Sequence, residues 1–186
     1  MKKSILAVWG VAALLCSCSS STSVETESGM KASAFVNGIG NVNSTFSYYD
    51  LTKVDAECEL YGFCGSEGFG RWSNGDTAII DLKTEPKSEF TVKMCIDRVI
   101  TPDDEAFVFD VLANNEPLTQ ISIHGRGNAY VNVPKSMVGG DGSVRLTLAF
   151  KNAALPAKYN PENKDGRKLG MAIKDITLYG YNLEEN

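Results

Sequence analysis

Three residues that lie close together in the chain have side chains suited to binding a sugar. These are Glu67, Arg71 and Trp72. An aromatic face stacks on the apolar face of a pyranose, while carboxylate and guanidinium groups form strong hydrogen bonds with hydroxyls. We therefore expect the three to contact a ligand. The alternative is structural: Glu67 pairs with an arginine and Trp72 lies in the core.

A second candidate group lies near the C-terminus, in the long segment 152–168. It contains Tyr159, Asp165 and Arg167, together with two prolines and several charges. Connections of this length in compact domains are often functional, and an exposed arginine can meet a phosphate or a carboxylate. We expect these three residues to contribute to ligand binding. The alternatives are a solvated charged loop, or pairing of Asp165 with Arg71 or Arg167.

Catalysis finds little support in the residue pattern. The chain has a single histidine and neither a G-x-S-x-G nor an H-E-x-x-H motif. Glu67 and Asp165 could form a glycosidase pair, but among 23 acidic residues such pairs arise by chance. Neither zinc-type cysteine spacing nor a fixed calcium-ligand spacing is present. The sequence therefore predicts a protein that is not an enzyme and has no metal or cofactor, with a weak glycan hydrolase as the less favoured alternative.

The elements that must position these residues are predicted to be strands. Apolar and polar residues alternate in several short segments, as expected for a sheet with one face on a core. Turn-forming residues such as Asn74-Gly75 and Asn114-Asn115 separate them. The spacing predicts an all-β sandwich, with a helical turn left open over 51–61. The predicted strands are 45–51, 70–73, 77–83, 89–98, 106–113, 119–124, 129–133, 144–150 and 171–181.

The N-terminus has the pattern of a bacterial lipoprotein signal. Lys2 and Lys3 precede an apolar segment, residues 5–15, that is too short to span a membrane. The sequence Leu15-Cys16-Ser17-Cys18 resembles a lipoprotein cleavage site. Cleavage before Cys18 leaves a small residue at the preceding position, so we expect 1–17 to be the signal and Cys18 to be lipidated. An ordinary secretory signal is the alternative. Residues 18–32 are predicted to be a flexible tether, and 33–186 a single β-sandwich domain.

This reading predicts a protein outside the cytoplasm, anchored by its lipid to the cell envelope. Ser19, in place of an aspartate, is typical of outer-membrane sorting in enterobacterial cells, so we expect the periplasmic face of the outer membrane. The net charge is −5, without a basic stripe. Nucleic acid is therefore excluded as a partner.

Three cysteines follow the predicted lipid attachment site, which is an odd number for an oxidising compartment. Cys58 and Cys64 enclose a short loop that contains a glycine, and we expect these two to form a disulfide. A bridge between Cys64 and Cys95 is the alternative.

Several short motifs, taken in order, resemble a known domain. They are Gly62-Phe63, the run 67–75, Ala78-Ile79-Ile80, Val133-Pro134, the run 144–150, Asn160-Pro161 and the run 165–178. Together they resemble the C-terminal β-sandwich domain of bacterial membrane phosphoglycerol transferases and related surface-polysaccharide enzymes. The resemblance covers about 62–181. It implies a jelly-roll-like antiparallel β-sandwich, similar to a carbohydrate-binding module, that contacts a glycan or glycolipid. Here the domain stands without the catalytic membrane protein.

Taken together, the sequence predicts a lipid-anchored binding or accessory module of the cell envelope. A glycan or glycolipid is the expected ligand. The alternative is a structural lipoprotein that binds an envelope protein partner.

Overall fold

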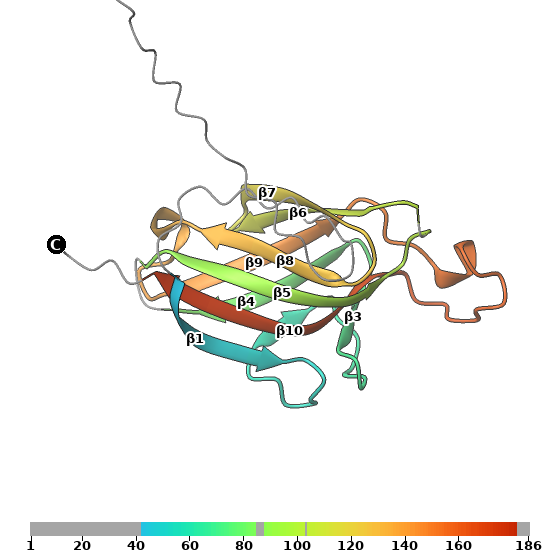
Figure 1. Cartoon of the computed structure of the whole chain (residues 1–186), viewed down its shortest axis with the longest axis horizontal. Helices are drawn as coiled ribbons and strands as arrows, with labels where there is room; N and C mark the ends of the chain where they lie inside the picture. Colours follow the sequence, from blue (N-terminus) through green and yellow to red (C-terminus); the bar gives the residue numbers. More distant parts are fainter. Residues whose placement is uncertain (1–41, 85–87, 103, 182–186) are drawn as a thin grey trace, which may run out of the picture.

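The computed structural model describes residues 42–84, 88–102 and 104–181. Two antiparallel sheets pack face to face, so the predicted β-sandwich is confirmed (Figure 1). No α-helix occurs among these residues, which contain only two short 3-10 turns, η1 (Lys135–Met137) and η2 (Pro156–Lys158). The strands are β1 (Val42–Asp50), β2 (Glu59–Tyr61), β3 (Arg71–Asn74), β4 (Thr77–Lys83), β5 (Phe90–Val99), β6 (Phe107–Ala113), β7 (Glu116–Ile123), β8 (Gly127–Val133), β9 (Ser143–Phe150) and β10 (Leu169–Tyr181).

One sheet contains β1, β10, β5 and β8 in that order, with β3 also paired to β10, and the other has the order β2, β4, β9, β6 and β7. The alternation in the sequence explains the core between them, because the apolar positions of each strand point inward. In β5, Phe90, Val92, Met94 and Ile96 are fully buried, as the sequence predicted. Burying this much apolar surface on both inner faces is the main stabilising contribution to the fold.

The predicted strands are all present, and all except 77–83 have shifted ends. The clearest shift is at β7, which begins at Glu116, because only Asn114 and Asn115 form the turn after β6. Both asparagines have positive φ values, 49° and 72°, which suits a tight two-residue hairpin turn. Pro117 is tolerated inside β7 because this strand lies at the edge of its sheet.

The segment between β1 and β3 differs most from the sequence prediction. Residues 51–58 form turns and bends, and Glu59–Tyr61 is a strand that was missed, so the helical turn considered for 51–61 is absent. Gly70 precedes β3 with a φ of +131°, and a Cβ atom there would lie 2.2 Å from the Ile173 carbonyl oxygen. Glycine therefore allows the chain to approach β10 closely at this point.

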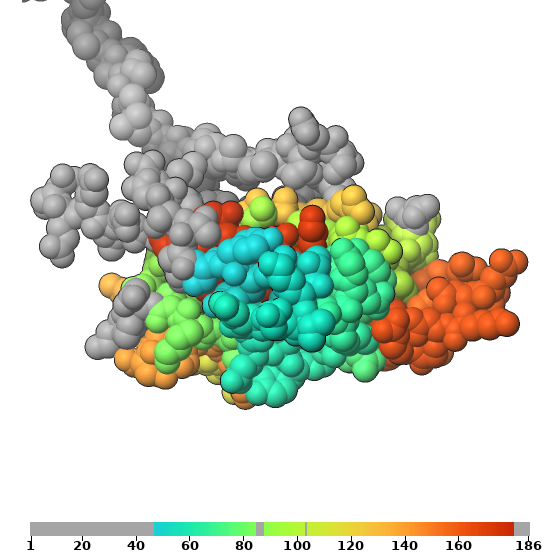
Figure 2. Space-filling model, turned by 90° about the horizontal axis from the view of Figure 1, so that it is seen from below, coloured from blue at the N-terminus to red at the C-terminus, as the bar shows by residue number. Residues whose placement is uncertain are grey.

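The connection between β9 and β10, residues 151–168, projects from one end of the sandwich (Figures 1 and 2). Within the described residues, no helix has the length and apolar character needed to span a membrane. The predicted signal, Cys18 and the tether lie outside the described residues.

Candidate functional site

The structure places Trp72 in the protein interior. Its side chain is only 7% exposed and packs with Leu169 and Ala172 in a small apolar cluster beside β3. The ring of Phe69 meets it edge-on, with centroids 6.1 Å apart. This burial agrees with the structural alternative for Trp72, and its contact with a ligand stays a prediction.

Arg71 also has a structural role. Its Nη2 atom donates hydrogen bonds to the backbone carbonyls of Lys53 and Val54, each at 2.8 Å. The guanidinium therefore holds the connection between β1 and β2 against β3. This differs from the pairing with a carboxylate that the sequence suggested.

Glu67, Asp165 and Arg167 do come together. The Arg167 Nη2 atom lies 2.6 Å from Asp165 Oδ2, and Arg167 Nη1 lies 3.5 Å from Glu67 Oε1. Hydrogen bonds from Arg167 lower the pKa of Asp165 to about 2. The group links the loop before β3 to the loop before β10, as expected for an ion pair that fastens two segments. Tyr159 contacts the neighbouring Lys158, whose Nζ atom lies 4.9 Å from the ring centroid.

The predicted disulfide between Cys58 and Cys64 is not formed, and Cys95 carries none either. The two side chains pack in different places. Cys58 contacts the main core, whereas Cys64 contacts the Trp72 cluster.

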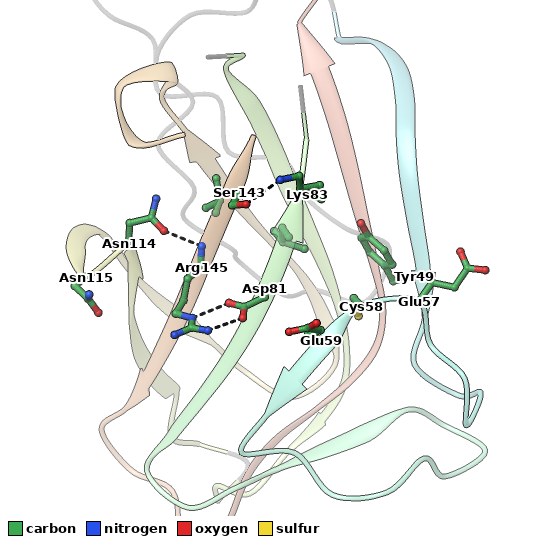
Figure 3. Close-up of a pocket in the computed structure, with 12 residues that line it drawn as sticks. Tyr49, Glu57, Cys58, Glu59, Asp81, Lys83, Asn114, Asn115, Ser143 and Arg145 are labelled. Carbon is green, nitrogen blue, oxygen red and sulfur yellow. Dashed lines mark hydrogen bonds and ion pairs between the residues drawn. The ribbon is translucent and has the colours of Figure 1, made fainter. Parts of the chain in front are cut away.

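A pocket of about 600 Å³ lies near the start of β9, whereas the long connection follows the end of that strand. Figure 3 shows the side chains that surround it. They come from β1, the start of β2, β4, the turn after β6, and β9. The charged and amide side chains among them include Glu57, Glu59, Asp81, Lys83, Asn114 and Arg145.

The centre of this pocket is a bidentate ion pair between neighbouring strands. Asp81 of β4 lies opposite Arg145 of β9, and Arg145 Nε and Nη2 donate to the two carboxylate oxygens at 2.8 and 2.6 Å. These hydrogen bonds lower the pKa of Asp81. Asp81 therefore stays ionised at neutral pH, where it can accept hydrogen bonds but cannot act as a general acid.

Other polar groups in the pocket are also held in place. Lys83 Nζ donates to Asp141 at 2.8 Å and to Ser143 at 3.0 Å. Asn114 accepts a hydrogen bond from the Arg145 backbone N–H at 2.9 Å and donates to the Met137 carbonyl at 2.7 Å. Polar groups fixed in this way bind a ligand without a large loss of side-chain entropy.

An exposed tyrosine lies beside the ion pair. Tyr61 of β2 is 49% exposed, and the Arg145 guanidinium carbon lies 5.9 Å from the centroid of its ring. Its hydroxyl donates to Glu59 at 3.1 Å. Tyr61 does not line the pocket itself, but its side chain contacts two residues that do, Arg145 and Glu59.

The sequence analysis missed this site. Asp81, Lys83 and Arg145 are the charged residues at outward positions of two alternating segments, which is a usable signal. What the sequence did not provide was the pairing of β4 with β9. Within residues 42–84, 88–102 and 104–181, no group of three or more His, Cys, Asp or Glu side chains is arranged to hold a metal ion.

No protein-family model and no curated protein matches the chain significantly. Among solved structures, an acetyl xylan esterase (Est2A) from the rumen bacterium Butyrivibrio proteoclasticus is 14% identical with a TM-score of 0.45, and the match covers 74% of this chain and 33% of the esterase. A family 35 carbohydrate binding module from an environmental isolate is 12% identical with a TM-score of 0.44, covering 72% of this chain and 92% of the module. Another family 35 module, from Clostridium thermocellum, is 7% identical with a TM-score of 0.39, covering 71% and 95%.

The chain thus spans about a third of the esterase it matches. Its assignment as a β-sandwich follows from its own strand pairing. The resemblance to the phosphoglycerol transferase domain stays a prediction.

Proposed function

We propose that the chain is a non-catalytic binding module, anchored to the cell envelope through a lipid on Cys18, and that its ligand is a glycan. The observation that carries the proposal is the exposed ring of Tyr61 beside a pocket of about 600 Å³ whose charged and amide groups are already fixed. Sugar binding needs both parts, since the ring stacks on the apolar face of a pyranose and the fixed groups bind hydroxyls.

The charges of the pocket favour a neutral glycan over an acidic one. Its two cations are each paired with a carboxylate, Lys83 with Asp141 and Arg145 with Asp81. Glu57 and Glu59 also line the pocket, so acidic groups outnumber basic ones there. A uronic acid or a phosphate would be repelled, whereas a hydroxyl group could accept from Arg145 and donate to Asp81.

A glycan array probed with the detergent-solubilised full chain tests the proposal. We expect binding to neutral glycans and a reduction of about two- to twelvefold in affinity for Tyr61→Ala, because an aromatic contact contributes about 0.5–1.5 kcal/mol. Val54→Ala serves as the control, since Val54 is the most exposed of the large apolar side chains described and lies in the connection between β1 and β2. Equal binding by wild type and Tyr61→Ala would contradict this site. If the wild type binds no glycan, an envelope protein becomes the favoured partner.

The anchor is tested separately by the mass of the mature N-terminus. We expect a lipid-modified Cys18 as the first residue and recovery of the protein with the membrane fraction. An unmodified N-terminus at another residue would contradict the anchor but leave the glycan site standing.

A further inference from the structure

The outer face of the sheet β1-β10-β5-β8 carries a row of polar and aromatic side chains. Strand pairing places Tyr48 opposite Thr177, Thr177 opposite Lys93, and Lys93 opposite Tyr130. The row therefore crosses four adjacent strands, which lie side by side in Figure 1. Lys93 alternates with inward residues that are fully buried, so the row faces away from the core.

The two tyrosines at the ends of this row are open to solvent. Tyr48 is 57% exposed and Tyr130 is 38% exposed. They lie on the two outer strands of the row, and three strand intervals separate them by about 14 Å. Thr177, in the middle, is only 5% exposed. Two aromatic rings separated by a polar row of this length suit a surface that binds a short oligosaccharide.

The groups around the row fit an uncharged polyhydroxyl ligand. Along the neighbouring register, Asp175 of β10 lies opposite Cys95 of β5, which in turn lies opposite Asn128 of β8. Lys93 and Asp175 can both form hydrogen bonds with hydroxyls. Asp50 of β1, opposite Asp175, adds a second carboxylate, which is paired with Lys53 at 3.5 Å. The face thus carries charges of both signs, and a strongly acidic or basic ligand gains no large net attraction from it.

A protein partner fits this face less well. Protein-binding patches usually present contiguous exposed apolar side chains. The exposed large aliphatic residues among those described, Val54 and Leu155, lie elsewhere, in the β1–β2 and β9–β10 connections. The face itself offers tyrosine rings, a threonine, a lysine and an amide.

We propose that this face is a second glycan-binding surface, on which a neutral oligosaccharide runs across the strands from Tyr48 to Tyr130. It rests on the proposed function for its ligand class but uses no residue of the pocket. Because the pocket is built mainly on the other sheet, one molecule would hold two glycan chains and bind a polysaccharide with higher avidity than either site alone.

Native electrophoresis through gels that contain soluble xylan, mannan or hydroxyethylcellulose first identifies a polysaccharide that retards the full chain. Titration calorimetry with the matching hexasaccharide then counts the sites. The variants are Tyr48→Val with Tyr130→Val, Tyr61→Ala for the pocket, and Val54→Ala as control. Valine is chosen because, like tyrosine, it is favoured in strands. Unfolding in urea verifies that each variant is folded.

We expect two hexasaccharides per chain for wild type and Val54→Ala, one for each site variant, and none when the variants are combined. One site that is lost only in Tyr61→Ala would overturn this inference while supporting the proposed pocket. One site that is lost only in the Tyr48 and Tyr130 variant would support the inference and contradict the pocket. No retardation of wild type in any gel would overturn both.

Lys93→Ser, which leaves both rings in place, is the second variant if the double change does not fold. Its loss of one site would again support the inference.

Discussion

Arg71 and Trp72 are neighbours on β3, and each is committed to a different part of the chain. The guanidinium binds two backbone carbonyls of the β1–β2 connection, while the indole fills a cluster between Phe69 and Leu169. In a sequence, an arginine next to a tryptophan suggests a sugar-binding site, because both residue types are common in such sites. The same two side chains are also the largest available for fastening a short strand to its surroundings.

Replacement of Trp72 by alanine is expected to affect stability more than binding. Removing a buried tryptophan should lower the free energy of unfolding by about 3–5 kcal/mol, because the cluster loses its largest member and cannot collapse fully. Urea denaturation measures this change. Tyr61→Ala is the matched control and should change the free energy of unfolding by less than about 0.5 kcal/mol, since its ring is exposed. A Trp72→Ala variant of normal stability that no longer binds glycan would show that Trp72 contacts the ligand directly.

Cys58 provides a second prediction for a single side chain. Burial raises the pKa of its thiol to about 11, although nearby Arg71 acts in the opposite direction. Since the thiolate is the reactive form, Cys58 in the folded protein should be alkylated by iodoacetamide at pH 8 roughly a hundred times more slowly than an ordinary cysteine. Mass spectrometry of peptides after timed alkylation measures the rate.

The same experiment in urea without a reductant tests the disulfide. Cys58, Cys64 and Cys95 should then all be alkylated. Protection of Cys58 and Cys64 in urea would restore the bridge that the sequence predicted.

Individual strands were predictable from the sequence, whereas their neighbours were not. The predicted limits of the segment 77–83 match those of β4. β4 nevertheless pairs with β9, and the ion pair between Asp81 and Arg145 joins residues 64 positions apart. Alternation states which side chains share a face of one strand, but it carries no information on which strand lies beside it. The pocket therefore could not be assembled from the sequence alone.

The missed strand β2 has a related cause. Its three residues, Glu59–Tyr61, are too few for a period to be recognised, and they become a strand only because β4 offers a free edge. This is a case in which tertiary pairing decides local structure. Tyr61, the exposed ring beside the candidate pocket, lies in this strand, so the error in the element also hid this candidate residue.

The connection between β1 and β2 depends on Arg71, and this leads to a prediction at the level of the element. Arg71→Ala should raise the rate of backbone hydrogen exchange in 51–58 by about tenfold or more, because each lost hydrogen bond to a charged group contributes about 1.5–3 kcal/mol. Exchange in β5 should change much less. Arg126→Ala is the control, as this arginine pairs with Asp97 in another part of the molecule. Equal protection of 51–58 in wild type and Arg71→Ala would show that other contacts hold the connection.

At the scale of the whole molecule, the two ends of the sandwich differ. One end carries the long β9–β10 connection, fastened by Arg167 to Asp165 and Glu67. The start of β9 carries the pocket, and its polar groups are paired with partners on adjacent strands. Ion pairs between distant segments thus occur at both sites, which couples the stability of the fold to the ionisation of its carboxyl groups.

This coupling predicts how stability depends on pH. The pKa values of Asp81, Asp110 and Asp165 are lowered in the folded protein, first of all by side-chain hydrogen bonds from Arg145, Lys151 and Arg167 respectively. In the unfolded chain an aspartate has a pKa of about 3.9, so in acid the unfolded state binds more protons than the folded state. The contribution of these groups is therefore complete above about pH 5 and is lost as the pH falls through 3.9 toward 2.

Urea denaturation between pH 7 and pH 2 checks this dependence, and Asp81→Asn is the informative variant. Its free energy of unfolding should be lower than that of wild type at pH 7 and should fall less steeply in acid, since one of the coupled carboxyl groups no longer titrates. Glu89→Gln is the control, because Glu89 is an exposed residue just before β5 and its removal should leave the acid slope as it is. Superimposed curves for wild type and Asp81→Asn would mean that the Asp81–Arg145 pair contributes nothing to the stability of the fold.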